Sequence, residues 1–137
     1  MSKITKEDYK NFKKDCQYWL REFGLQGWFQ SITKDGLDDC YGEVWWDNNK
    51  RVLEISLNVK HEFKNEKEKK EFLKRTAVHE CLEVLVGSSL ERIMKEWKLM
   101  KYKPIEDEII FEEERHNIIR VLENLLYNKE IKNEFFY

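Results

Sequence analysis

Apolar side chains follow two different periods along this chain, and the change of period divides it into three regions. In the first region they recur every three to four residues between Tyr9 and Phe23, which predicts an amphipathic helix with its aromatic side chains in a core. Thr5 with Asp8 three residues later resembles a capping box, in which Asp replaces the usual Glu, and predicts the start of this helix. Gly24 follows the pattern and supplies a stop.

In the middle of the chain the period changes to two. Short runs rich in aromatic and β-branched residues, separated by turn sequences, predict three antiparallel strands at 28–34, 40–47 and 51–58. The third run has one apolar and one polar face, as in a sheet that helices cover on one side. Trp45 and Trp46 point to opposite faces, so one of them is expected to be exposed, either shielding the edge of the sheet or lining a substrate cleft.

The second half of the chain returns to the helical period. Residues 72–86 predict a central helix that stops at Gly87. The Lys- and Glu-rich run at 60–71 predicts a solvated first turn of this helix. Residues 88–103 predict a second amphipathic helix or an irregular connection, and the apolar positions over 109–126 predict a final helix.

The central helix carries the motif H-E-x-x-E, formed by His79, Glu80 and Glu83. Residues four apart lie one above the other on a helix, so His79 and Glu83 can reach one divalent metal ion, and zinc accepts both imidazole and carboxylate ligands. In the related motif H-E-x-x-H, the intervening Glu is the general base. The alternative is an ordinary ion pair on a helix surface. Because the pair shares its face with Phe72 and Val86, we expect partial burial, and buried charges require a partner or a metal.

A third metal ligand would have to come from another part of the fold. His116 lies on a flank of the final helix that could face the central helix, and it is otherwise a boundary residue. Glu112 and Glu113 lie one turn earlier and are the reserve ligands. His61 also precedes a Glu, but Asn65 stands where a second ligand would be needed, so no site is predicted there.

Composition predicts one domain over residues 1–137, because 41% hydrophobic residues and five Trp are enough for a sizeable core. The formal net charge of −2 requires neither nucleic acid nor an anionic membrane as a partner. Cys16, Cys40 and Cys81 have no C-x-x-C spacing, which predicts free thiols, and Cys81 is expected in the core. Without an apolar signal sequence or a membrane span, the expected location is the cytoplasm.

Taken together, the order of elements, the H-E-x-x-E motif and the sequence EEERHNIIRVLE at 112–123 resemble the small zincin-type metallopeptidases of phages and prophages, which are distantly related to SprT-like zincins. The resemblance covers most of the chain. It implies an α+β fold, with an N-terminal helix, a small three-stranded antiparallel sheet, and central and C-terminal helices packed on one face. It also implies a Zn²⁺ site formed by His79, Glu83 and His116, with Glu80 as the general base. The expected substrate is a protein or peptide, with a host protein as one candidate.

Glu83 replaces the second His of the usual motif, and its negative charge makes a bound metal a weaker Lewis acid. Two other functions therefore remain open. One is a non-catalytic protein-binding module on a zincin scaffold, with zinc structural or absent. The other is a carboxylate-rich di-metal enzyme, because Glu80-x-x-Glu83 and Glu113-x-x-His116 are typical of helical di-metal sites. The predicted strands count against a helical bundle.

Overall fold

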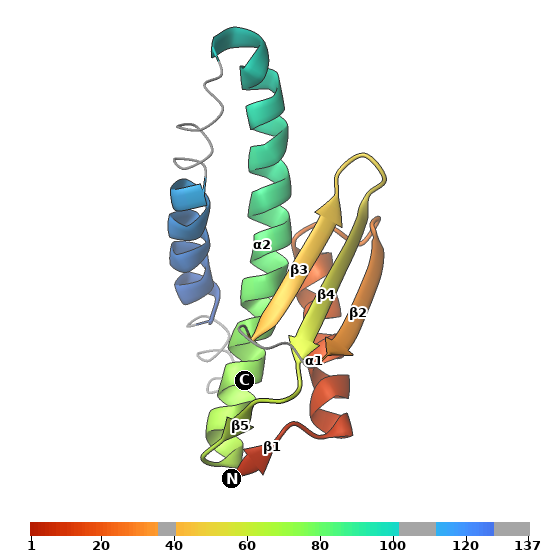
Figure 1. Ribbon diagram of the computed structural model, residues 1–137, viewed down its shortest axis with the longest axis vertical. Helices are drawn as coiled ribbons and strands as arrows, with labels where there is room; N and C mark the ends of the chain where they lie inside the picture. Colours follow the sequence, from red (N-terminus) through yellow and green to blue (C-terminus); the bar gives the residue numbers. More distant parts are fainter. Residues whose placement is uncertain (36–40, 102–111, 128–137) are drawn as a thin grey trace.

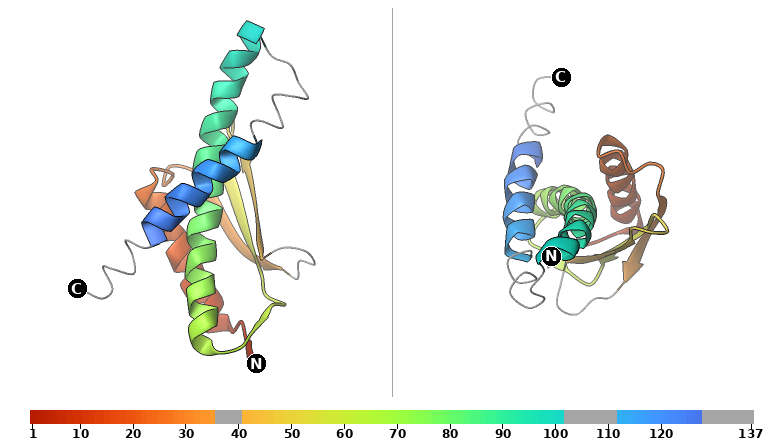
Figure 2. Two further views of the ribbon diagram at one scale, coloured as in Figure 1. Left: turned by 90° about the vertical axis from the view of Figure 1, so that its left-hand side faces the viewer. Right: turned by 90° about the horizontal axis from the view of Figure 1, so that it is seen from above.

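Helix α2 (Glu66–Lys101) is the axis on which the other elements are arranged (Figure 1). The computed structural model describes residues 1–35, 41–101 and 112–127. Helix α1 (Lys6–Glu22) and a sheet lie on one side of α2, and a helix over 112–127 lies on the other side (Figures 1 and 2). The predicted α+β class is therefore confirmed.

Helix α1 begins and ends where its sequence predicts. The Thr5 hydroxyl accepts a hydrogen bond from the backbone N–H of Asp8 (3.1 Å), and the Asp8 carboxylate accepts one from the backbone N–H of Thr5 (2.9 Å). These two bonds satisfy helix N–H groups that have no partner within the helix. Gly24 follows the helix with a φ of 76°, a left-handed conformation that glycine adopts without strain.

The core lies between α1, α2 and the inner face of the sheet. Cys81 of α2 is fully buried there, and its thiol donates a hydrogen bond to the carbonyl of Cys16 in α1 (3.5 Å). This confirms the prediction that Cys81 is a core residue. Cys16 and Cys81 are free thiols, whereas Cys40 lies outside the described residues.

The three predicted strands are present as β2 (Phe29–Asp35), β3 (Gly42–Asp47) and β4 (Val52–Asn58). Their order is β2-β4-β3, with β3 antiparallel to β4 but β2 parallel to β4. The sheet is therefore mixed, and the prediction of an entirely antiparallel sheet is wrong.

β4 lies in the middle of the sheet, between β2 and β3. Leu53, Ile55 and Leu57 of β4 are completely buried, whereas Glu54 between them is exposed, which confirms a sheet covered on one face. This strongly apolar face favours the middle of the sheet, where both neighbours and the helices cover it. A tight turn, in which the Asp47 carboxylate accepts backbone hydrogen bonds, joins β3 to β4 as a hairpin. β2 and β3 run in opposite directions, so β2 must lie parallel to the strand between them.

Helix α2 is much longer than the predicted 72–86 segment, because it continues through Gly87 to Lys101. The prediction of a stop at Gly87 is wrong, and residues 88–101 of the separate segment predicted after it belong to the same helix. Instead, Gly87 allows the Trp46 ring to approach the helix closely, because a Cβ built on Gly87 would lie 2.6 Å from Cη2 of Trp46. Trp46 thus packs on α2, whereas Trp45 is 55% exposed on the other face of the sheet.

A second, two-stranded sheet joins the N-terminus to the start of α2. β1 (Ser2–Lys3) pairs antiparallel with β5 (Glu62–Phe63). Beside them Lys69 is 1% exposed, and its ammonium group contacts the Asp8 carboxylate at 2.7 Å and the Lys3 carbonyl at 2.9 Å. The prediction that the 60–71 run is solvated is therefore wrong at Lys69, because tertiary partners satisfy its charge.

The 112–127 helix packs against α2 and runs back along it in the opposite direction (Figures 1 and 2). Ile119 is its fully buried anchor. This helix contacts α2 on the side away from the sheet, so the prediction that the central and C-terminal helices both pack on one face of the sheet is only partly correct. The predicted start of the helix, before residue 112, lies outside the described residues.

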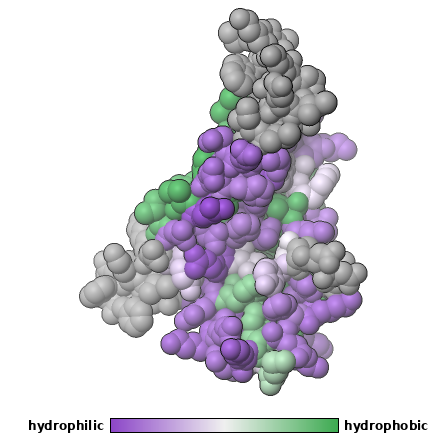
Figure 3. Space-filling view, turned by 60° about the vertical axis from the view of Figure 1, so that its left-hand side comes forward, coloured by the Kyte–Doolittle hydropathy of each residue, from purple (hydrophilic) through white to green (hydrophobic). Residues whose placement is uncertain are grey.

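The outer side of this helix carries exposed apolar side chains at Ile118, Val121 and Leu125. Figure 3 views the molecule from near this side, where hydrophobic groups interrupt a largely hydrophilic surface. None of the helices in the described part of the chain has both the length and the apolar character needed to cross a bilayer.

Candidate functional site

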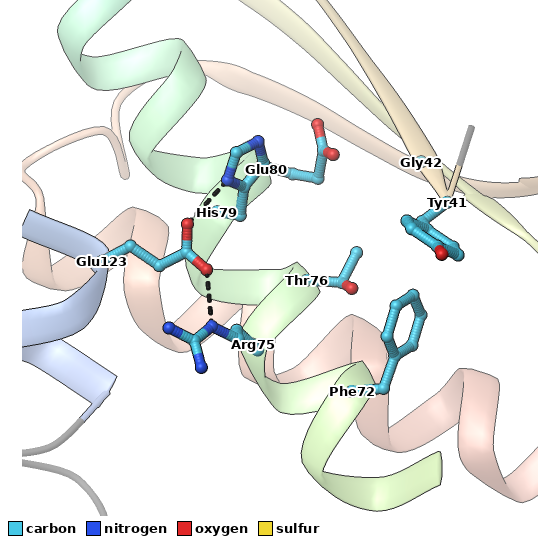
Figure 4. Close-up of a pocket in the computed structure, with 8 residues that line it drawn as sticks. All are labelled: Tyr41, Gly42, Phe72, Arg75, Thr76, His79, Glu80 and Glu123. Carbon is cyan, nitrogen blue, oxygen red and sulfur yellow. Dashed lines mark hydrogen bonds and ion pairs between the residues drawn. The ribbon is translucent and has the colours of Figure 1, made fainter. Parts of the chain in front are cut away.

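The candidate site lies between α2 and the 112–127 helix, beside the start of β3 (Figure 4). It contains a pocket of about 410 Å³. The side chains around it come from all three elements and from the residue before β3. They are Tyr41, Gly42, Phe72, Arg75, Thr76, His79, Glu80 and Glu123. The two helices therefore bring together residues that are more than 40 positions apart in the sequence.

His79 is held between two carboxylates. Its Nε2 atom lies 3.5 Å from Oε1 of Glu83, one helical turn away, and its Nδ1 atom lies 2.8 Å from Oε2 of Glu123. The hydrogen bond to Glu123, followed by that to Glu83, raises the pKa of His79 to about 10. With no metal bound, His79 is therefore an imidazolium at neutral pH. As a metal ligand it would lose the Nε2 proton and keep the Nδ1–H bond to Glu123.

Glu83 is the point where the two helices meet. Its Oε1 atom lies 3.5 Å from Nε2 of His79 and 4.0 Å from Nδ1 of His116, while its Oε2 atom lies 3.6 Å from Nε of Arg115. Burial raises the pKa of Glu83, but the hydrogen bond from His79 and the charge of Arg115 outweigh burial and lower it below its ordinary value. Glu83 is thus an anion with one oxygen directed at both imidazoles.

The structure brings His79, Glu83 and His116, the three expected ligands, close to one another. The two imidazole nitrogens lie within 3.5 and 4.0 Å of the same carboxylate oxygen. Glu112 contacts the other nitrogen of His116 at 3.6 Å, so one reserve ligand lies at the edge of the group. Glu113, the other reserve ligand, has an exposed side chain.

Glu80 points away from the 112–127 helix towards β3 (Figure 4). Its residue is 6% exposed, and a Cβ built on Gly42 would lie 3.3 Å from its Oε1 atom. Burial is the largest cause that raises the pKa of Glu80, to about 7. Because Glu80 and Glu83 point to different sides, this geometry does not favour the di-metal arrangement considered from the sequence.

Glu123 is the site residue to which sequence reasoning gave no role. It accepts hydrogen bonds from His79 (2.8 Å) and from Nε of Arg75 (2.9 Å). Burial raises the pKa of Glu123, but these two hydrogen bonds lower it overall. A sequence signal existed, because Glu123 lies two helical turns after His116 and shares its flank. The sequence does not show which α2 residue contacts Glu123, because that contact depends on how the two helices pack.

The distances between these side chains approach those of a zinc site. Atoms bound to one tetrahedral zinc ion at about 2.0–2.2 Å lie roughly 3.4 Å apart. The separation of His79 and Glu83 matches this value, whereas that of Glu83 and His116 is longer. Within the described ranges, no three or more His, Cys, Asp or Glu side chains form a complete metal-binding group. Zinc accepts imidazole and carboxylate ligands, and the His116 side chain is 53% exposed.

An imidazole–carboxylate donor set of this kind also occurs without catalysis, so similarity to known proteins is relevant. Comparison of the chain with protein-family models, curated proteins and solved structures finds no match.

Proposed function

We propose that this protein is a zinc-dependent metallopeptidase, in which His79, Glu83 and His116 hold the ion and Glu80 is the general base. One observation carries the proposal: donor groups from two helices converge on a single oxygen of Glu83 beside a pocket that Glu80 lines. When bound, zinc would supply a Lewis acid that polarises the scissile carbonyl group.

Glu80 has the protonation chemistry of a general base, and it lines the pocket. A base is most effective when its pKa lies near the working pH, and burial raises the pKa of Glu80 to about 7. Its carboxylate would take a proton from the attacking water and pass it to the leaving amine. Its carboxylate lies on the wall of the pocket, beside Gly42 of β3.

Arg115 offsets the charge that Glu83 introduces. A His at position 83 would be a neutral ligand, whereas the Glu83 carboxylate adds a negative charge and weakens a bound Lewis acid. The Arg115 guanidinium lies 3.6 Å from the carboxylate oxygen that faces away from His79. This cation withdraws electron density from Glu83, so the pair is closer to a neutral ligand than Glu83 alone.

The ion pairs themselves favour a second candidate, a non-catalytic protein-binding module. The pairs His79–Glu123, Arg75–Glu123 and Arg115–Glu83 all cross from α2 to the 112–127 helix. Such a network can hold the two helices together without a metal ion. In that case zinc is dispensable, and the same residues stabilise the fold.

Metal content and hydrolysis separate the two candidates. Elemental analysis of protein purified without a His tag is expected to give one zinc per chain. His79→Ala should abolish zinc binding, Glu83→Gln should weaken it with the fold intact, and His116→Ala should lower the affinity by orders of magnitude.

The third histidine supplies the control. His61→Ala should retain zinc, because no contact joins His61 to the ligand group among the described residues. Glu80→Gln should keep the metal and lose hydrolysis of a peptide mixture. Equal zinc content in wild type and all variants, or no zinc in any of them, would contradict the metallopeptidase.

A further inference from the structure

Four rings form a cluster at one end of the pocket. They belong to Tyr41 just before β3, His61 just before β5, Phe63 of β5 and Phe72 of α2. The Tyr41 ring lies 4.6 Å from the Phe72 ring and 4.8 Å from the His61 ring, measured between centroids, and Phe63 lies 4.9 Å from Phe72. The edge-to-face contacts of Tyr41 hold these rings in fixed orientations.

Only two of the rings line the pocket. Tyr41 and Phe72 face it, as Figure 4 shows, whereas Phe63 is 5% exposed and supports them from behind. Tyr41 is 52% exposed, so a large part of an aromatic ring is open to a ligand. An exposed aromatic wall whose rings already contact one another is an apolar binding surface for a ligand.

This wall and Glu80 lie on the same line along α2. Phe72, Thr76 and Glu80 are spaced by four residues, so they share one face over two helical turns, about 12 Å. An extended peptide advances about 3.3 Å per residue. A peptide bond placed at Glu80 therefore puts a side chain about four residues from that bond against Tyr41 and Phe72.

The opposite wall of the pocket is charged, and its groups are already paired. Arg75 donates hydrogen bonds to Glu123 and Asn124, and the second oxygen of Glu123 bonds to His79. The Arg75 guanidinium disfavours a basic ligand side chain, and the Glu80 carboxylate disfavours an acidic one. Tyr41 and Phe72 are the aromatic part of the pocket lining.

We propose that Tyr41 and Phe72 form a specificity subsite for a large apolar side chain, best an aromatic one, close to the cleaved bond of a peptide substrate. This proposal rests on the proposed peptidase function, because it names the substrate class of the same site. Tyr41 and Phe72 act here as specificity residues and take no part in proton transfer.

Cleavage of a peptide mixture by the zinc-loaded protein, with products mapped by mass spectrometry, tests the preference. Phe, Tyr, Trp, Leu and Met are expected to be enriched at one position near the cleaved bond. Tyr41→Ala should lower kcat/KM about tenfold for a Phe-containing peptide and leave an Ala-containing peptide unchanged. Trp45→Ala is the matched control, because it also removes an exposed aromatic ring. Trp45 belongs to β3 and lies on the face of the sheet away from α2. No apolar preference, or an equal loss in both variants, would overturn the subsite.

A binding measurement separates failure of the subsite from failure of the proposed function. NMR titration of wild type and Glu80→Gln with N-acetyl-phenylalanine amide requires no hydrolysis. We expect shifts at Tyr41 and Phe72 that N-acetyl-alanine amide does not produce and that Tyr41→Ala removes. Binding without any cleavage would refute the peptidase and retain the apolar subsite. Cleavage without this binding preference would retain the peptidase and refute the subsite.

Discussion

Gly87→Ala sets two opposite effects on stability against each other. In an ordinary helix interior, replacing Gly with Ala stabilises the protein by about 1 kcal/mol, because Ala loses less conformational entropy on folding. In this protein the new methyl group would lie 2.6 Å from Cη2 and 2.7 Å from Cζ2 of Trp46. Contacts this short cannot persist, so either the indole ring or the helix has to move.

The contacts of the ring decide which effect is larger. The indole N–H of Trp46 donates a hydrogen bond to the Glu91 carboxylate (3.0 Å), one turn further along α2. Moving the ring strains or breaks this bond, which contributes about 1 kcal/mol. Overpacking by one methyl group costs about 1–3 kcal/mol. Set against the gain of about 1 kcal/mol in helix propensity, Gly87→Ala should lower the free energy of unfolding by about 1–3 kcal/mol.

Urea denaturation of wild type and variants, followed by circular dichroism, measures this difference. Ser89→Ala is the control for helix propensity, since Ser89 is exposed two positions later in α2, and it should be neutral or slightly stabilising. In a Trp46→Val background the clash is gone, and there Gly87→Ala should be stabilising. If Gly87→Ala stabilises the otherwise wild-type protein, the close approach of Trp46 does not explain Gly87.

Three further predictions concern charged side chains. Asp8→Asn should destabilise the protein at neutral pH, and the difference in the free energy of unfolding between wild type and variant should shrink as the pH falls below about 4. The contacts of Asp8 lower the pKa of its carboxyl group in the folded protein, so the contribution of Asp8 to stability is lost as the carboxylate protonates. Acid titration of stability measures this. Lys69→Met should cost about 2 kcal/mol in urea denaturation, because it leaves the Asp8 carboxylate and the Lys3 carbonyl without this donor; an unchanged midpoint would show that the buried ion pair contributes nothing. Arg115→Gln should tighten zinc binding and slow peptide hydrolysis, because the Glu83 carboxylate that Arg115 faces would then carry its full charge. If zinc affinity and the rate of hydrolysis both rise or both fall in this variant, Arg115 does not compensate the charge of Glu83.

Local sequence patterns predicted the elements well, because the forces that define them act over a few residues. The cap formed by Thr5 and Asp8, the alternation in β4 and the pairing of His79 with Glu83 each follow from the geometry of one helix or strand. The predicted helix stop at Gly87 is wrong because the role of this glycine depends on a residue of the sheet. Glycine ends many helices, but here it makes room for the indole ring of Trp46.

The candidate site could be predicted only in part for the same reason. His79, Glu80 and Glu83 share one helical turn, and their spacing in the sequence is sufficient to group them. Glu123 reaches His79 only because the 112–127 helix returns along α2. The aromatic wall is less predictable still, because Tyr41 and Phe72 come from separate elements that meet where β3 begins.

The position of Glu80 depends on how closely β3 approaches α2, and two glycines allow that approach. At one end Gly42 leaves room for the Glu80 carboxylate and for the carbonyl of Ser56, at 3.3 and 3.0 Å from a Cβ built there. At the other end Gly87 receives the ring of Trp46. From Gly42 to Trp46 the strand advances about 13 Å, and from Glu80 to Gly87 the helix advances about 10 Å, so the two elements run side by side in the same direction over similar lengths (Figure 1). The strand is thus fixed to the helix at both ends, which keeps the Glu80 carboxylate buried and holds it against the pocket. The fold and the proposed chemistry therefore rely on the same two close contacts.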